Sequence, residues 1–157
     1  MSLANVCGRP VTQMVSGEVS RIVRAPREQV YARYLTAYQD VPRLYPNLVK
    51  SMKLLSQEGN VRTFRCDEVW GGRSFRYTMK ETLHAPSGSD QIVLDGEGKG
   101  MRSRWAFEAV EGGTNVRMIY EWKGLKGLVI GGLMRKRFEQ EFAGALERYS
   151  RILEAPA

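Results

Sequence analysis

The sequence has little of what metal and nucleophile chemistry requires. Its 157 residues include one histidine and two cysteines, Cys7 and Cys66, which are far apart along the chain. Two distant cysteines form neither a disulfide framework nor a zinc site. His84 has no partner at a spacing typical of a Ser-His-Asp or Cys-His arrangement, and it precedes Ala85-Pro86 at a predicted turn. We therefore predict no metal, no cofactor and no histidine-based catalysis.

Long apolar runs and a secretion signal are also missing. No stretch approaches the roughly 18 apolar residues of a membrane-spanning helix, and residues 1–13 lack a basic region followed by an apolar one. With so few cysteines, we expect a reducing, cytoplasmic setting. Residues 15–155 are predicted to form a single domain, because no repeat, low-complexity tract or linker interrupts them. Residues 1–14 are predicted to be an N-terminal extension, in part derived from a tag.

Positive charge is in excess, with a formal net charge of +7 and an isoelectric point near 9.6. Such a balance favours anionic partners, including nucleic acid, acidic lipid or a carboxylate ligand. The lysines and arginines are scattered rather than gathered in one block. We interpret them as a generally basic solvated surface and do not expect a nucleic-acid partner. The oligomeric state has no signature in the sequence.

Apolar periodicity predicts an α+β domain. A strand at 15–24 ends at Ala25-Pro26, where proline suits the first turn of a helix through 28–35. A second short helix is expected near 39–45, because Pro42 and Pro46 punctuate this region too heavily for a long one. Alternation then predicts six more strands, at 48–57, 61–70, 73–84, 90–96, 101–110 and 114–123. Their short connections make the sheet antiparallel.

The last predicted element is a long amphipathic helix over 128–153. Its apolar stripe consists of Met134, Phe138, Phe142, Ala145, Tyr149 and Ile152, spaced three or four residues apart. The charged residues Glu141 and Arg148 are assigned to its other sides. A helix of this length must cover the aromatic face of the sheet.

Two hairpins allow the strand register to be predicted. With Gly112-Gly113 as a two-residue loop, the expected pairs are Ala109–Val116, Phe107–Met118, Trp105–Tyr120 and Ser103–Trp122. With Gly71-Gly72 as the loop, they are Phe64–Met79, Cys66–Tyr77 and, facing outward, Asp67–Arg76. Each register places apolar or small residues together on one face of the sheet.

The order of these elements and three local segments resemble the SRPBCC superfamily, which includes START lipid-transfer domains, birch-pollen-allergen-like proteins and polyketide cyclases. The segments are 19–31 (VSRIVRAPREQVY), 45–48 (YPNL) and 104–121, with its Gly-Gly-Thr turn. The polyketide cyclase/dehydratase and coenzyme Q-binding group is the most similar. The resemblance implies a helix-grip fold, in which a curved seven-stranded antiparallel sheet wraps a long C-terminal helix, with two short helices after the first strand.

The same resemblance implies an apolar cavity between sheet and helix, although a filled core also explains the pattern. A dry void of ~300 Å³ would cost on the order of 7 kcal/mol, so the space must be small, hydrated or occupied. The candidate ligand-binding residues are Tyr34, Tyr45, Phe64, Cys66, Tyr77, Met79, Trp105, Phe107, Met118, Tyr120, Met134, Phe138 and Phe142.

Three charged residues are candidate polar handles for a ligand. Alternation places Glu68 and Glu81 on the apolar side of their strands, and the Gly71-Gly72 register puts Arg62 opposite Glu81. An ion pair exposed at the open end of the sheet is the favoured interpretation. The alternative is a polar group inside the cavity that orients a ligand or moves a proton. Glu68, near the hairpin tip, is expected close to solvent.

Two glycine-rich segments resemble functional loops. Residues 96–100 (GEGKG) are expected to form a hairpin turn, since a phosphate loop needs a helix N-terminus after its strand. Residues 124–134 (GLKGLVIGGLM) are interpreted either as a close helix–sheet approach or as a lid over the cavity. Lys123, Lys126 and the basic residues 135–137 lie nearby, so peripheral contact with an anionic membrane is a further alternative.

The sequence thus favours a carrier that binds a small hydrophobic molecule, such as a lipid, an isoprenoid quinone or a polyketide-like compound. A second interpretation is an enzyme of the polyketide cyclase or aromatase type, with tyrosine and glutamate groups that shift protons in the same cavity. Inward-facing tyrosine and carboxylate groups within hydrogen-bond reach would favour this enzyme. A third is a protein- or RNA-binding module that uses the basic surface.

Overall fold

A computed structural model describes residues 14–70, 72–123 and 132–155. The elements are β1 (Met14–Val23), α1 (Arg27–Leu44), β2 (Val49–Glu58), β3 (Val61–Trp70), β4 (Arg73–His84), β5 (Gly88–Gly96), β6 (Arg102–Val110), β7 (Gly113–Lys123) and α2 (Gly132–Glu154). The predicted α+β class and the seven predicted strands are confirmed. No helix in the described ranges is long and apolar enough to cross a bilayer.

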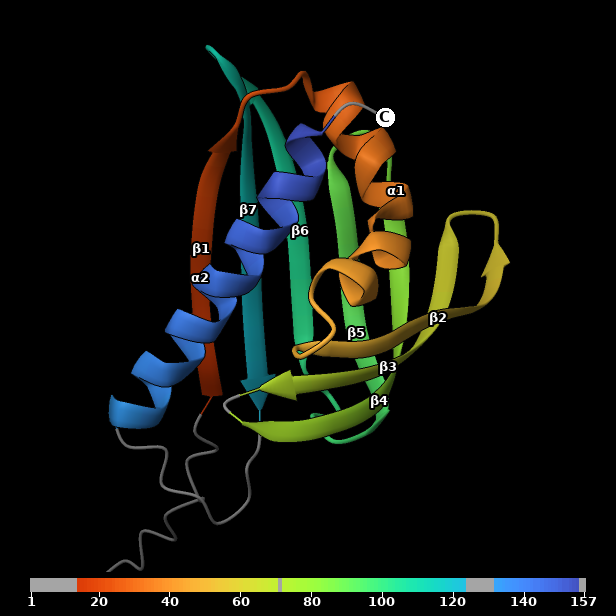
Figure 1. Cartoon of the computed structure of the whole chain (residues 1–157), viewed down its shortest axis with the longest axis vertical. Helices are drawn as coiled ribbons and strands as arrows, with labels where there is room; N and C mark the ends of the chain where they lie inside the picture. Colours follow the sequence, from red (N-terminus) through yellow and green to blue (C-terminus); the bar gives the residue numbers. More distant parts are fainter. Residues whose placement is uncertain (1–13, 71, 124–131, 156–157) are drawn as a thin grey trace, which may run out of the picture.

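All seven strands form one antiparallel sheet in the order β1-β7-β6-β5-β4-β3-β2. The sheet curls strongly, so that β2, β3 and β4 run across the view of Figure 1 while β1 and β7 run along it. Helix α2 crosses the inner face beside β1 and β7, and its C-terminal part contacts α1 (Figure 1). This arrangement is the helix-grip fold that the resemblance to the SRPBCC superfamily implies.

The prediction of two short helices after the first strand is wrong, because α1 is continuous from Arg27 to Leu44. No helix breaker separates Leu35 from Gln39. Pro42 lies in the last turn, where its missing N–H removes only one hydrogen bond near the helix end. Helix α1 buries one face against the sheet and α2, namely Val30, Tyr31, Tyr34, Ala37 and Val41.

The β3–β4 hairpin has the predicted register. Cys66 pairs with Tyr77, Phe64 with Met79, Arg62 with Glu81 and Asp67 with Arg76. On the outer face, Arg76 Nε donates a hydrogen bond of 3.2 Å to Asp67 Oδ2. The inner face of this hairpin packs with Val93 as an apolar cluster.

The β6–β7 register differs from the prediction by two residues. Phe107 pairs with Val116, Trp105 with Met118 and Ser103 with Tyr120. The two residues between the strands are therefore Glu111 and Gly112, whereas Gly113 begins β7. A Cβ atom on Gly113 would lie 2.0 Å from the Val23 carbonyl oxygen, so this glycine is required where β7 meets the end of β1. An even shift preserves the alternation, and the predicted faces remain correct.

The main hydrophobic core fills the space where α1 and α2 meet β1, β6 and β7. Its largest members are aromatic, including Tyr31, Tyr34, Trp105, Phe107, Tyr120 and Phe142. Tyr120 stacks on Phe142, with ring centroids 3.9 Å apart and ring planes at 8°. A separate cluster joins the ends of the two helices through Ala37, Val41 and Ile152. The space left between these clusters holds the candidate site.

Candidate functional site

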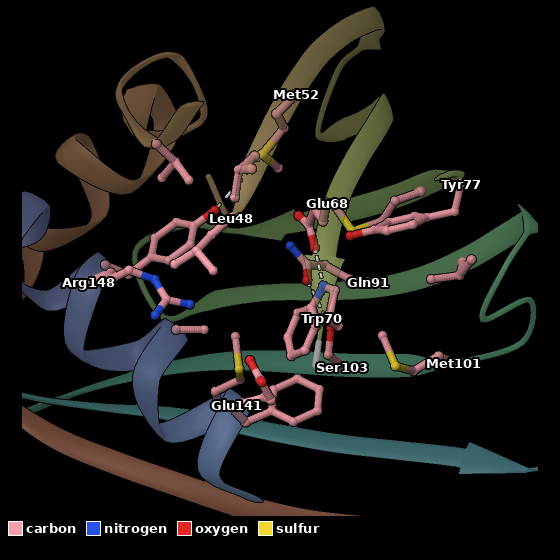
Figure 2. Close-up of a pocket in the computed structure, with 18 of the residues that line it drawn as sticks. Leu48, Met52, Glu68, Trp70, Tyr77, Gln91, Met101, Ser103, Glu141 and Arg148 are labelled. Atoms are coloured by element: carbon pink, nitrogen blue, oxygen red, sulfur yellow. Dashed lines mark hydrogen bonds between the residues drawn. The ribbon is translucent and has the colours of Figure 1, made fainter. Parts of the chain in front are cut away.

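A pocket of about 80 Å³ lies between the inner face of the sheet and α2. Figure 2 shows side chains that reach it from the strands on one side and from the helix on the other. The lining residues are Val41, Leu48, Val49, Met52, Glu68, Val69, Trp70, Tyr77, Met79, Gln91, Ile92, Val93, Met101, Ser103, Trp105, Met118, Glu141, Phe142, Ala145, Arg148 and Tyr149.

Most of the pocket wall is apolar. Four methionines contribute to it: Met52 from β2, Met79 from β4, Met118 from β7, and Met101 from the position just before β6. Trp105 and Tyr149 close one side, with ring centroids 5.0 Å apart. Methionine side chains are unbranched and turn about several bonds, so this wall can change shape at a small energetic cost.

Glu68 brings a carboxyl group into this apolar surface. Trp70 Nε1 donates a hydrogen bond of 2.6 Å to Glu68 Oε2, and Tyr77 lines the same pocket. Burial raises the pKa of the Glu68 carboxyl, although the Trp70 hydrogen bond, the nearby Tyr77 hydroxyl and the charge of Arg148 oppose the increase. Burial and then the Glu68 charge raise the pKa of Tyr77 well above its usual value, so Tyr77 remains a neutral donor.

Beside the pocket, Arg62 and Glu81 form a buried ion pair, with exposed fractions of 4% and 1%. Arg62 donates to Glu81 Oε2 through Nε at 2.8 Å, and its Nη2 lies 2.6 Å from the same oxygen. Arg62 Nη1 donates at 2.7 Å to the carbonyl of Leu35 in α1. The favoured expectation of an exposed pair is therefore wrong, because α1 covers this end of the sheet.

The other oxygen of Glu81 accepts hydrogen bonds from three side chains. The donors are the Tyr34 hydroxyl, Ser89 Oγ at 2.9 Å and Gln91 Nε2 at 3.1 Å. Burial, followed by the charge of Glu81, raises the pKa of Tyr34 well above its usual value. With both oxygens satisfied, Glu81 is held as part of the scaffold.

A chain of polar side chains connects this ion pair to the pocket. Ser103 Oγ donates to Gln91 Oε1 at 2.8 Å, and Gln91 in turn donates to Glu81. Gln91 and Ser103 both line the pocket. The buried ion pair therefore fixes the orientation of two groups that a ligand would contact.

Helix α2 contributes two charged residues to the pocket, Glu141 and Arg148. In Figure 2 both extend from the helix toward the space in front of Trp70. The Arg148 guanidinium lies 5.8 Å from the centroid of the Tyr45 ring. Glu141 also interacts with another group, so neither side chain is without a partner. The interpretation of these residues as part of the other sides of the helix is wrong, since they line the pocket.

The structure separates the predicted ligand-binding residues into groups. Five of them line the pocket: Tyr77, Met79, Trp105, Met118 and Phe142. Phe64 and Cys66 are buried in the β3–β5 cluster, and Tyr34, Phe107 and Tyr120 in the main core. Tyr45 packs beside the cluster at the helix ends. The side chains of Met134 and Phe138 lie outside the described residues.

Among the candidate handles, Glu68 lines the pocket, whereas Arg62 and Glu81 belong to the network beside it. Sequence reasoning missed Gln91 and Ser103, which are the polar ends of that network. Their only signal is their place on the inner face of strands that are otherwise apolar, and that signal does not distinguish them from a polar edge of the sheet.

The remaining sequence features lie away from the pocket lining. His84 Nε2 is 2.8 Å from Asp90 Oδ2 in an exposed contact. Residues 96–100 connect β5 to β6, as predicted, with positive φ at Gly96, Gly98 and Gly100. Most of the segment 124–134 lies outside the described residues. Within the described ranges, no group of histidine, cysteine and acidic residues is arranged to hold a metal ion.

The fold and the pocket together define a helix-grip protein with a small, largely apolar interior space. Residues 14–154 match the family described as polyketide cyclase / dehydrase and lipid transport, and the chain belongs to that family. This match confirms the resemblance to the SRPBCC superfamily. No curated protein matches the chain by sequence.

Solved structures share the fold at low sequence identity. TTHA0849 from Thermus thermophilus is 24% identical with a TM-score of 0.68, and the alignment covers 88% of this chain and 94% of that one. A START superfamily protein from Mycobacterium smegmatis is 19% identical over 90% and 94%, with a TM-score of 0.66. The Zhui aromatase/cyclase from Streptomyces sp. R1128 is 16% identical over 90% of each chain, with a TM-score of 0.62.

Proposed function

We propose that the protein binds a small hydrophobic ligand, such as a lipid, an isoprenoid quinone or a polyketide-like molecule, and acts as its carrier. The observation that carries this proposal is the pocket between the sheet and α2, with its methionine and aromatic wall and a few polar groups at one end. Sites for small molecules commonly combine an apolar wall with a few convergent polar groups. The family description, which includes lipid transport, supports the same function.

The size of the pocket requires that a ligand enlarge it. At about 80 Å³ it would cost only ~2 kcal/mol as an empty space, which a domain tolerates. Pockets that enclose drug-sized ligands are larger, on the order of 300 Å³ or more. Reorientation of Met52 and Met101, which are partly exposed, would provide part of the difference.

Native mass spectrometry of freshly purified protein, followed by organic extraction, tests this proposal. We expect either one bound apolar molecule per chain or binding of a compound from a panel that includes dodecanol, naphthol and dodecanoate. A clean unliganded mass, with no binding and no thermal shift across the panel, would overturn the proposal.

A matched pair of variants on α2 tests whether the ligand binds in this pocket. Ala145 lines the pocket and is 7% exposed, whereas Ala143 on the same helix is exposed. Ala145→Phe should fill the space and weaken binding by at least about tenfold, whereas Ala143→Phe should leave it unchanged. Ala145→Leu replaces Ala145→Phe if the larger side chain prevents folding. Equal affinity of all variants would place the ligand elsewhere.

An enzyme of the polyketide cyclase or dehydratase type is a second candidate, and the presence of Tyr77 and Glu68 in the same pocket lining favours it. Because both groups line the pocket and Glu68 has a raised pKa, the pair can give a proton to a bound carbonyl or hydroxyl and take one back. Incubation with a β-hydroxy ketone tests this candidate. Turnover that Glu68→Gln abolishes, with ligand affinity unchanged, would support an enzyme rather than a carrier.

A binding module for RNA or protein has less support. On the outer face of the sheet, four arginines pair with carboxylates: Arg65 with Asp95, Arg76 with Asp67, Arg104 with Asp90 and Arg117 with Glu18. This pairing neutralises part of the basic surface. Steep salt dependence of RNA binding would revive the alternative. We also propose a cytoplasmic location and peripheral contact with an anionic membrane, to be tested by fractionation and vesicle sedimentation.

A further inference from the structure

A second, smaller hollow of about 30 Å³ adjoins the pocket. Its additional lining residues are Phe75, Glu97, Gly98 and Trp122, near the turn between β5 and β6. Five residues line both spaces: Trp70, Tyr77, Val93, Met101 and Phe142. Because these side chains are shared, the two hollows are separated by a wall only one side chain thick.

Met101 is the part of this wall that can move most easily. Trp70 is held by its hydrogen bond to Glu68 and by contact with the Phe142 ring, at a centroid distance of 5.0 Å. Tyr77 is 9% exposed and packed in the buried cluster of β3–β5. Met101 is partly buried and packs against both neighbouring hydrophobic clusters. A turn of its unbranched side chain would join the two hollows into one elongated space.

The two ends of that space differ in polarity. The larger pocket has polar or charged lining residues that are absent from the smaller one, namely Glu68, Gln91, Ser103, Glu141 and Arg148. The charged residue of the smaller hollow is Glu97, which is exposed and lies 3.8 Å from Arg73 in an ion pair. A ligand that filled both hollows would therefore have a polar group at one end and an apolar tail at the other.

Arg148 is the only basic residue among the described residues that line the pocket, and the carboxylate of Glu141 on the same helix interacts with another group. No carboxylate in the described part of the chain forms an ion pair with Arg148, and the Tyr45 ring flanks its guanidinium. Glu68 accepts a hydrogen bond from Trp70, and burial raises the pKa of its carboxyl, which makes the uncharged form easier to reach than in water. A partly buried guanidinium in an apolar wall gains most from a carboxylate or a phosphate, which it binds through two hydrogen bonds.

We infer that the ligand is an elongated amphipathic molecule whose anionic head, a carboxylate or phosphate, binds Arg148, and whose apolar tail passes Met101 into the hollow beside Phe75 and Trp122. This inference rests on the proposed ligand-binding function and specifies the ligand class. A fatty acid and a monoalkyl phosphate share the required chemistry.

Binding of matched twelve-carbon ligands tests the head group. Dodecanoate, dodecyl phosphate, dodecanol and dodecylamine have the same tail and differ in charge. We expect the wild type to bind one of the anions about tenfold or more tightly than the alcohol, as for a charge-assisted hydrogen bond. Arg148→Gln should remove this preference. Arg151→Gln is the matched control, since Arg151 lies on the same helix but pairs with Glu147 at the surface, with 68% of its side chain exposed.

A comparison of hexanoate with dodecanoate tests the path of the tail. The longer acid should bind the wild type more tightly, and Met101→Trp should reduce that gain because the indole cannot turn aside in the same space. The preference of dodecyl phosphate over dodecanoate, or the reverse, distinguishes a phosphate head from a carboxylate head.

The contrary outcomes separate this inference from the proposed function. Tightest binding of dodecylamine, or an anion preference that survives in Arg148→Gln, would overturn the anionic head. Binding of dodecanol or naphthol with no preference for anions would overturn the inference and leave the ligand-binding function intact. Failure of every compound to bind would overturn both.

Discussion

Arg62 on β3 and Glu81 on β4 form an ion pair in the interior, with Arg62 Nη2 2.6 Å from Glu81 Oε2. Each partner compensates the desolvation of the other, and the remaining hydrogen-bonding groups are satisfied by Leu35, Tyr34, Ser89 and Gln91. An ion pair at this depth is sensitive to the loss of either member, because the remaining charge has no access to water.

Replacement of Arg62 should therefore destabilise the fold strongly. We expect Arg62→Leu to reduce the free energy of unfolding by about 3–5 kcal/mol, since Glu81 is left buried without a counter-charge. The exposed pair between Arg76 and Asp67 is the control, and Arg76→Leu should cost less than about 1 kcal/mol. Urea unfolding of the two variants provides the measurement. Equal decreases in the free energy of unfolding would show that burial of the Arg62–Glu81 pair does not increase the cost of losing its arginine.

The raised pKa of Glu68 predicts a pH dependence of stability. In the unfolded chain Glu68 returns to its ordinary pKa, so above that value the folded state binds more protons than the unfolded state. The contribution of Glu68 to stability should therefore decrease as pH rises from about 4 toward neutrality.

Glu68→Gln removes this proton linkage. Its free energy of unfolding, relative to that of the wild type, should increase as pH rises over the same interval. Parallel curves of unfolding free energy against pH for the two proteins would contradict the prediction.

Gly17 on β1 provides a steric prediction. A Cβ atom there would lie 2.3 Å from the Tyr120 hydroxyl oxygen, and Tyr120 is 3% exposed and stacked on Phe142. Gly17→Ala should therefore destabilise the protein by about 1–3 kcal/mol through overpacking. Tyr120→Phe removes the nearest clashing atom but leaves the ring carbon Cζ, 2.6 Å from the added Cβ, so the double variant should recover only part of the loss. A thermal unfolding series checks this, and strictly additive losses would contradict the predicted clash.

Cys66 reports on the opening of the sheet. It has an exposed fraction of 0%, and burial raises the pKa of its thiol, so both access and the reactive thiolate are suppressed. In a Cys7→Ser background, a thiol reagent should modify native protein at least about a hundredfold more slowly than urea-unfolded protein. Similar rates in the two states would indicate that the β3–β5 region opens readily.

The strand plan was predictable because turn glycines and alternation act locally. Gly71-Gly72 fixed the β3–β4 register, which the structure confirms. Gly112-Gly113 did not fix the β6–β7 register. Gly113 lies against the backbone of Val23 and belongs to β7 rather than to the loop. Sequence patterns do not contain that contact. The even shift explains why the buried face was predicted correctly although the individual pairs were not.

The polar part of the site was harder to predict. The pairing of Arg62 with Glu81 follows from register, but its burial depends on α1, whose Leu35 carbonyl accepts a hydrogen bond from Arg62. A hydrophobic stripe predicts the inward side of a helix, and this rule assigns Arg148 and Glu141 to the other sides of α2 although both line the pocket. Where a pocket has a polar end, charged residues of the helix face inward instead of toward solvent. Apolar periodicity alone does not show where such an end lies.

The methionine wall of the pocket has a consequence for oxidative chemistry. Met52 and Met101 are partly exposed, whereas Met79 and Met118 are 6% and 7% exposed, so oxidants reach the first two more readily. Conversion of a thioether to a sulfoxide makes the side chain polar. Peroxide would thus turn an apolar wall into a polar one without altering the backbone, and methionine sulfoxide reductases would restore it. Ligand capacity in this protein is therefore expected to follow the redox state of its surroundings.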